Sequence, residues 1–130
     1  MANLRGVFLA GTPHWRTPAK LYADLDAEFH FDLDPCPIRG GGGLVLSWAG
    51  RRVYCNPPYG RGIIDWVTKA REAALAVFLL PARTDTEWFQ VCLREAREIR
   101  FIRGRLHFGD AKGAAPFPSI IVIFSGGNDE

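Results

Sequence analysis

An unbroken apolar run from Ala76 to Leu80 constrains the fold of this chain more than any other segment. Strands that face solvent on one side alternate apolar and polar residues, whereas this run, which Pro81 ends, has no polar position. It is typical of a parallel strand that is buried on both faces. The segment from Ser119 to Phe124 is strongly β-branched and predicts a further strand. Because strands and amphipathic segments alternate along most of the sequence, we expect an α/β sheet with flanking helices.

Three helices are expected from apolar periodicity and capping signals. Thr17 is predicted to cap the first helix, which has Pro18 at its first position. The spacing of Thr84 and Glu87 is that of a capping box, and it predicts the start of the third helix. The predicted apolar faces contain Leu21, Tyr22, Leu25 and Phe29 in the first helix, Ile63, Trp66, Val67, Ala70 and Ala74 in the second, and Trp88, Val91, Cys92 and Ala96 in the third.

Shorter strands are expected between these helices. Residues 29–34 alternate apolar and polar side chains, which predicts a strand that ends before Pro35 and brings Asp34 to the edge of the sheet. Two more strands are expected at 51–55 and 99–103. The run of four glycines that ends at Gly43 is expected to be a plain flexible loop.

Length and composition restrict the class of protein. The 130 residues predict one domain, residues 1–130, with an N-terminal arm at 1–14 and a polar tail at 125–130. A formal net charge of +2 is compatible with a polyanionic partner but is too small to indicate one. Three cysteines without paired spacing suit a reducing cytoplasm, so we expect no disulfide and no metal site. No stretch approaches the roughly 18 apolar residues of a membrane span, and we expect a soluble cytoplasmic protein without a membrane partner.

The strongest functional signal is the string Asn56-Pro57-Pro58-Tyr59, which follows the strand expected at 51–55. It is the signature of enzymes that methylate a planar amino group, whose nitrogen lone pair is delocalised into the neighbouring π system. The Asn56 side-chain oxygen and the Pro57 carbonyl can accept hydrogen bonds from such a group and return electron density to its nitrogen. Pro58 stiffens the direction of the Pro57 carbonyl, and Tyr59 offers a face on which a base can stack. The alternative is that the string is only a rigid strand exit with an aromatic plug.

Three loops are expected to converge at one edge of the sheet. In open α/β sheets, ligands bind where loops leave the C-terminal ends of the strands. The loops concerned are Asp34-Pro35-Cys36, Asn56 to Tyr59, and Pro81 to Asp85. A cofactor is therefore expected at this edge.

Six segments in a fixed order carry a resemblance to a known family. They are Trp15-Arg16-Thr17-Pro18, 31–36, 55–59, 80–89, 103–108 and 116–119, and they span about residues 15–124. This ordered set resembles the phage-type Dam-like DNA N6-adenine methyltransferases. The resemblance implies a compact, truncated Rossmann-like sheet that uses S-adenosylmethionine to methylate adenine in DNA, and a phage or prophage origin.

The same resemblance implies a set of cofactor contacts. They are Trp15, Thr17, Pro18, Asp34, Pro35, Cys36, Asn56 and Pro81. The chain departs from the general methyltransferase plan, because Asp34-Pro35-Cys36-Pro37 replaces the usual glycine loop after the first strand. The segment 37–51 is also too short for the elements that normally bring an acid to the cofactor ribose. Asp34, Asp32 or a partner subunit could supply that contact, and a homodimer would complete the thin cofactor half.

Contacts to DNA are expected from residues near the strand ends. Tyr59, Arg83, Arg105 and His107 are the candidates, with solvated surface charge as the alternative for the last three. A flipped adenine would stack on Tyr59, while Asn56, Pro57, Pro58 and Tyr59 form the catalytic set. Trp88, Cys36 and Cys55 are interpreted as buried packing residues.

Two other functions remain open from the sequence. One is a methyltransferase that acts on a different amino or amide acceptor, such as an RNA base or a protein glutamine. The other is a catalytically inactive, DNA-binding relative of these enzymes, which the shortened cofactor half would explain.

Overall fold

A computed structural model describes residues 15–36, 42–109 and 113–126. The arm predicted at 1–14, the first two of the four glycines, and residues 127–130 of the predicted tail lie outside these ranges. Over the ranges described, no helix is both long and apolar enough to cross a membrane.

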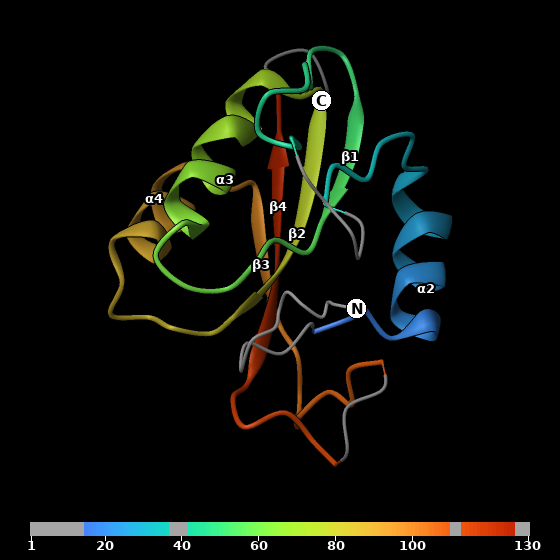
Figure 1. Cartoon of the computed structure of the whole chain (residues 1–130), viewed down its shortest axis with the longest axis vertical. Helices are drawn as coiled ribbons and strands as arrows, with labels where there is room; N and C mark the ends of the chain where they lie inside the picture. The colour runs from blue at the N-terminus through green and yellow to red at the C-terminus, as the bar shows by residue number, and fades with distance from the viewer. Residues whose placement is uncertain (1–14, 37–41, 110–112, 127–130) are drawn as a thin grey trace.

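Four strands form one mixed sheet at the centre of the molecule (Figure 1). They are β1 (Arg52–Cys55), β2 (Leu75–Pro81), β3 (Glu98–Phe101) and β4 (Ser119–Ser125), in the order β1-β2-β4-β3. β1 and β2 are parallel, whereas β4 is antiparallel to both of its neighbours. Every residue of β2 and all but the last of β4 are buried, which confirms the strands predicted from the two apolar runs.

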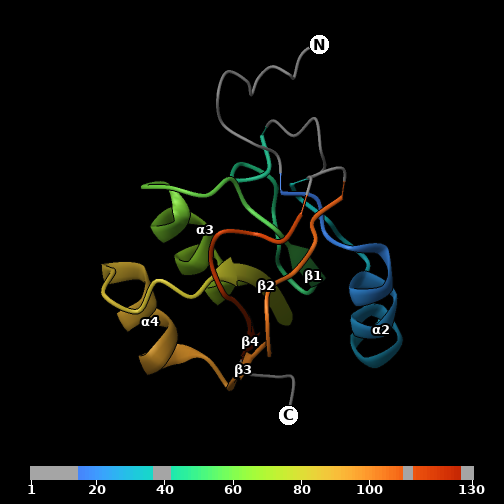
Figure 2. The same ribbon diagram turned by 90° about the horizontal axis from the view of Figure 1, so that it is seen from below.

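Helices cover both faces of the sheet (Figure 2). Helix α2 (Ala19–Phe29) lies on one face, while α3 (Ile63–Lys69) and α4 (Glu87–Glu95) lie on the other. A 3₁₀ turn, Ala70–Glu72, extends α3. The described residues thus form a mixed α/β structure of one four-stranded sheet and three α-helices, and the predicted α/β class is confirmed.

The predicted helix faces supply the two cores. Leu25 and Phe29 of α2 are buried in one of the two cores, which also contains Tyr54 and Phe108. Ile63, Trp66, Val67 and Ala70 pack in the other core, where Trp88, predicted to be a packing residue, has only 6% of its surface exposed. The periodicity of apolar residues therefore identified the buried faces, except that Ala74, predicted on the second helix, lies beyond the 3₁₀ turn and is half-buried.

Both predicted helix caps are wrong. Helix α2 begins at Ala19 after an extended Pro18, and no side chain caps it. The Thr17 hydroxyl instead makes long-range hydrogen bonds, which are described below. Helix α4 is capped by Thr86, whose Oγ1 accepts a hydrogen bond of 3.2 Å from the Phe89 backbone N–H. At α4, Thr84 and Thr86 both have suitable side chains, and only the local backbone direction separates them.

The strand predicted at 29–34 is reduced to a single bridge between Leu33 and Val53. Phe29 belongs to helix α2, because His30 adopts a left-handed backbone (φ 56°) and donates its N–H to the Asp26 carbonyl, which ends the helix. The bridge is parallel to β1, so the chain still leads Asp34 toward the edge where β1 ends.

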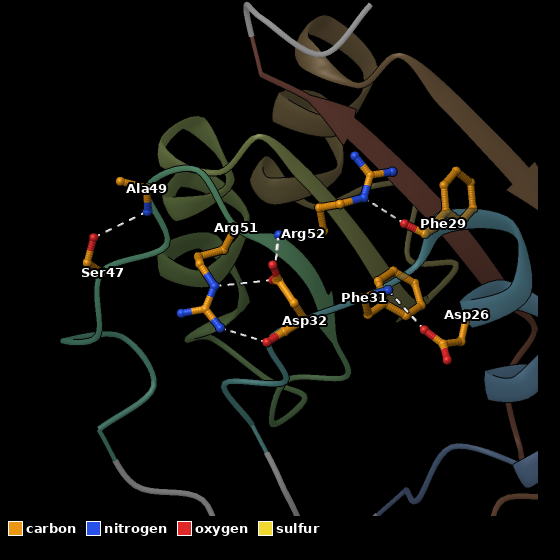
Figure 3. A network of polar contacts seen from close by, with 8 residues as sticks. All are labelled: Asp26, Phe29, Phe31, Asp32, Ser47, Ala49, Arg51 and Arg52. Carbon is orange, nitrogen blue, oxygen red and sulfur yellow. Dashed lines mark hydrogen bonds and ion pairs between the residues drawn. The ribbon is translucent and has the colours of Figure 1, made fainter.

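Asp32 attaches this segment to the start of β1 (Figure 3). Its Oδ1 accepts hydrogen bonds from Arg51 Nε (3.2 Å) and from the Arg52 backbone N–H (2.8 Å). Arg51 Nη2 also donates to the Asp32 carbonyl, at 2.7 Å. These contacts occupy one carboxylate oxygen and the backbone carbonyl of Asp32.

Glycine has a packing role at the end of the glycine run. A Cβ atom on Gly43 would lie 2.1 Å from the Pro35 carbonyl oxygen and 2.8 Å from the Trp66 ring. The Gly43 carbonyl also accepts a hydrogen bond of 3.2 Å from the buried Trp48 indole. The plain flexible loop predicted here is therefore wrong for Gly43, which is packed against the loop that follows the Leu33 bridge.

Smaller differences concern the last elements. β3 ends at Phe101, two residues before the predicted end. β4 continues through Ser125, and the Gly126 N–H donates to the Ala74 carbonyl at 2.7 Å, so the sheet extends into the first part of the predicted tail. All three cysteines are free thiols; Cys55 and Cys92 are buried, and Cys36 is half-buried.

Candidate active site

Asn56 follows the last residue of β1, and its side chain is hydrogen-bonded to the segment that precedes helix α2. Its side-chain nitrogen Nδ2 donates one hydrogen bond to the Trp15 carbonyl and another, of 3.2 Å, to Thr17 Oγ1. An amide nitrogen has two N–H donors, so both are used. No residue in the described ranges donates to the side-chain oxygen Oδ1, which is left as an acceptor on a half-buried side chain.

Thr17 connects Asn56 to the core. Its Oγ1 lies 2.5 Å from the hydroxyl of Tyr54, a β1 residue that is 2% exposed. Burial raises the pKa of Tyr54 far above its ordinary value, so this phenol stays neutral at physiological pH. The ring of Tyr54 packs edge-on against Tyr22 of helix α2, with centroids 5.1 Å apart.

The three residues after Asn56 differ in exposure. Pro57 is buried, Pro58 is exposed, and Tyr59 is half-buried between the two cores. The Tyr59 hydroxyl points inward and donates to the Leu79 carbonyl of β2 at 3.4 Å, and burial raises its pKa well above the ordinary value. Its ring meets Phe117 edge-on, with centroids 5.6 Å apart. Tyr59 is thus anchored at its hydroxyl and along one edge.

Phe117 is the centre of an aromatic cluster that sequence reasoning missed. Trp15 contacts both Phe117 (5.2 Å between centroids) and Phe108 (5.4 Å), and the Arg83 guanidinium lies 5.8 Å from the Phe117 ring. Trp15, Tyr59 and Arg83, which are far apart in sequence, therefore meet around one buried ring. Tyr54 was missed as well. The only available signal was that both are large aromatic residues next to recognised motifs, and such residues more often serve the core.

The loop of Asp34, Pro35 and Cys36 leaves the same edge of the sheet. The Cys36 backbone N–H donates to Asp34 Oδ1 at 3.1 Å. Desolvation raises the pKa of the Asp34 carboxyl above its ordinary value, although this hydrogen bond opposes the shift. Burial also raises the pKa of the Cys36 thiol, to about 11, so it is a poor nucleophile at neutral pH. Neither residue shares a hydrogen bond with Asn56 in the described structure.

The remaining candidates lie at the ends of other strands. Pro81 is the last residue of β2 and pairs with Ser119 of β4. Arg105 is exposed, and its Nη1 donates to the Ala115 carbonyl at 3.4 Å. His107 is exposed. The geometry thus brings together Trp15, Thr17, Asn56, Tyr59 and Arg83 through direct or shared contacts, and it does not join Arg105 or His107 to them.

Comparison with known proteins identifies the family. Residues 41–125 match the DNA N-6-adenine-methyltransferase (Dam) family. The chain belongs to this family. A DNA N-6-adenine-methyltransferase of Haemophilus phage HP1 (strain HP1c1) is 28% identical over an alignment of 133 positions, which covers 85% of this chain and 77% of the phage protein. No solved structure matches the chain.

Family membership confirms the predicted family and the predicted class of activity, adenine-specific DNA methylation. The matched range contains Asn56 to Tyr59 and the three basic candidates Arg83, Arg105 and His107. Trp15, Thr17 and Asp34 precede it. The described contacts of Asn56 therefore join the matched range to a segment outside it.

Proposed function

We propose that this Dam family member transfers a methyl group from S-adenosylmethionine to the N6 atom of an adenine that is flipped out of DNA. The orientation of the Asn56 amide carries the proposal. With both Nδ2 donors bound to Trp15 and Thr17, the free group at the end of β1 is the acceptor Oδ1, which is the atom that an adenine amino group requires.

The residues at the sheet edge fit the proposed cofactor. A methionine ammonium and a ribose need acceptors, and Asp34 offers a carboxylate whose Oδ1 accepts the Cys36 N–H and whose Oδ2 accepts no hydrogen bond from a described residue. When bound, S-adenosylmethionine supplies an electrophilic methyl group on a sulfonium. Trp15, Pro18, Pro35, Cys36 and Pro81 complete the proposed contact set, whereas the hydroxyl of Thr17 contacts Asn56 and Tyr54.

The chain acts on the acceptor base by orientation and charge stabilisation. Asn56 Oδ1 and the Pro57 carbonyl would accept hydrogen bonds from the two N6 hydrogens, so that electron density would return to the nitrogen. Tyr59 presents a ring face to the flipped base, and Pro58 holds the turn. The proposed transfer needs no covalent enzyme intermediate. The methyl group would leave the sulfonium, whose sulfur keeps the electron pair of the broken C–S bond, and N6 would lose one proton to solvent.

The proposed fold is a truncated Rossmann-like sheet. The Leu33 bridge, β1 and β2 run parallel and lead three loops to one edge, as expected for a cofactor crevice. The described chain between the bridge and β1 has no additional strand, in keeping with a shortened cofactor half. A homodimer that completes this half remains a prediction.

DNA contacts are proposed at Arg83, Arg105 and His107. Arg83 has the best support, because it lies over the Phe117 ring that also touches Tyr59. A guanidinium that contacts the same ring as the stacking residue can reach the phosphates that flank a flipped nucleotide.

Substitution of Asn56 tests the proposal. Asn56→Ala is expected to lower kcat by about 100-fold or more, since it removes a preorganised group that acts on the reacting atoms. Gln90→Ala, which truncates an exposed amide on α4, is the matched control and should keep wild-type turnover. Activity is measured by transfer of labelled methyl groups to DNA and by sequencing of the modified bases, with circular dichroism and calorimetry to check folding and cofactor binding. Near-normal turnover by Asn56→Ala would contradict the assigned role.

The stacking role of Tyr59 has its own test. Tyr59→Ala should weaken binding of DNA with a flipped adenine by about 1–3 kcal/mol, whereas Tyr59→Phe keeps the ring and loses only the bond to the Leu79 carbonyl. Equal binding by both variants would exclude stacking on this ring. Parallel incubations with RNA and with a glutamine-containing protein show whether the enzyme methylates either of these other acceptors. Calorimetry tests the remaining alternative, because an absence of binding heat with S-adenosylmethionine would indicate a catalytically inactive relative.

A further inference from the structure

Thr17 and Tyr54 form a connection between the buried core and the side-chain amide of Asn56. The Tyr54 hydroxyl lies 2.5 Å from Thr17 Oγ1, and Thr17 Oγ1 accepts a hydrogen bond of 3.2 Å from Asn56 Nδ2. Tyr54 comes from β1, two residues before Asn56, whereas Thr17 comes from the segment before α2. Two separate parts of the chain therefore meet at one hydroxyl.

The two ends of an asparagine amide are nearly equal in size and opposite in hydrogen bonding. Rotation by 180° about the last side-chain bond would exchange Oδ1 and Nδ2. It would place Oδ1 against the Trp15 carbonyl, which is acceptor against acceptor, and would turn two N–H donors toward the amino group of the base. The rotated amide could not accept a hydrogen bond from N6. Catalysis by Asn56 thus depends on which end of the amide faces the base.

We infer that Thr17, held in place by the buried Tyr54 hydroxyl, is a positioning residue that keeps Asn56 Oδ1 directed at the amino group to be methylated. This inference rests on the proposed function of Asn56. Thr17 has one hydroxyl proton and two lone pairs, so it can accept from Asn56 and still bond to Tyr54. The Trp15 carbonyl, which can only accept, decides which end of the amide faces the base, and Thr17 holds the amide in that position. The neighbours of Tyr54 hold its ring firmly, because it packs against Tyr22 and Phe31 with centroids 5.1 and 5.4 Å away. Thr17 therefore has a fixed partner on the side away from Asn56.

The role differs from the capping role predicted for Thr17 and from a direct contact with the cofactor. A cap would stabilise α2, but no side chain caps that helix. A cofactor contact would affect binding of S-adenosylmethionine, whereas a positioning role affects the rate at saturation. Kinetics and spectroscopy can separate these roles.

The experiment compares Thr17→Val, which replaces the hydroxyl by a methyl group of similar size, with Thr17→Ser, which keeps the hydroxyl. Thr17→Val should lower kcat about tenfold, the effect of losing one hydrogen bond of about 1.4 kcal/mol, with little change in KM for DNA or cofactor. In Thr17→Ser, kcat should stay within about twofold of the wild-type value. Tyr54→Phe should lower kcat about two- to tenfold, because Thr17 remains but loses its support.

Tyr22→Phe is the matched control for Tyr54→Phe. It removes a hydroxyl from the adjacent ring, and this hydroxyl makes no hydrogen bond to a described residue. It should leave kcat unchanged. Tyr54→Phe also keeps the test possible if Thr17→Val fails to fold, which thermal melting will show.

Nuclear magnetic resonance of the Asn56 side-chain NH₂ group gives a readout that does not depend on activity. Its signals are assigned by their loss in Asn56→Ala. In the wild type both protons should exchange slowly with water, and in Thr17→Val and Tyr54→Phe one should shift and exchange at least severalfold faster. Thr17→Ser should resemble wild type.

The outcomes distinguish this inference from the proposed function. Full activity of Asn56→Ala overturns the proposed function whatever the spectra show. Loss of activity in Asn56→Ala, combined with unchanged Asn56 signals and kcat in Thr17→Val, overturns only the positioning role. A higher KM for S-adenosylmethionine with unchanged kcat would assign Thr17 to the cofactor and also overturn it.

Discussion

Gly43 allows the most direct calculation of a substitution effect from this structure. A Cβ atom there would lie 2.1 Å from the Pro35 carbonyl oxygen, and ordinary contact begins at 3.4 Å. Gly43→Ala therefore requires a movement of about 1.3 Å between two backbone segments, together with a shift of the Trp66 ring, which would be 2.8 Å away. Overpacking of this kind costs about 1–3 kcal/mol. For a domain of this size the expected decrease in Tm is about 3–15 °C.

Gly62→Ala is the matched control, because a Cβ atom at Gly62 would meet nothing within 4 Å and the residue has a helical backbone. Its free energy of unfolding should change by no more than about 0.5 kcal/mol. Urea denaturation and thermal melting followed by circular dichroism measure both variants. Since Pro35 follows Asp34, Gly43→Ala should also weaken S-adenosylmethionine binding in calorimetry. Equal stability of Gly43→Ala and Gly62→Ala would refute the close approach on which this reasoning depends.

Three further predictions concern capping, charge and thiol reactivity. Thr86→Ala should lower the free energy of unfolding by about 1 kcal/mol in urea titrations, while Thr84→Ala should have little effect, because only Thr86 accepts a hydrogen bond at the start of α4. Asp34→Asn should raise Tm at pH 7, since desolvation penalises the charged carboxylate of the folded state. This gain should vanish as the pH falls below about 3.8, the ordinary pKa of aspartate, where wild-type Asp34 is protonated in both states. Cys36 should react with iodoacetamide far more slowly than a free thiol at pH 8, and faster as the pH rises toward its pKa of about 11; rapid labelling in mass spectrometry would contradict this.

Predictions from periodicity succeeded where burial is uniform. The run from Ala76 to Leu80 and the β-branched segment after Ser119 became the two central strands, because a segment without polar positions has no face to turn toward water. The prediction for 29–34 failed over most of its length for a related reason. Phe29 satisfies both a helical and an alternating pattern, and its contact with the same core as Leu25 decided for the helix.

Capping predictions failed because they depend on backbone direction. Thr17 and Thr84 both have suitable side chains, yet neither caps a helix. The Thr17 hydroxyl found partners 37 and 39 residues away in sequence. A local pattern contains no information about such partners, because they approach only when the sheet and helix α2 have assembled.

The sequence by itself determined the family and the class of activity: the order of the motifs and the buried strands are local properties of the chain, and the family match agrees with the predicted activity. The tertiary structure alone decided the orientation of the Asn56 side-chain amide. Which end of the Asn56 amide faces outward depends on Trp15 and Thr17, and the position of Thr17 depends on a buried hydroxyl of Tyr54. Hydrogen bonds between distant segments set this orientation, and they exist only when folding has brought those segments into contact.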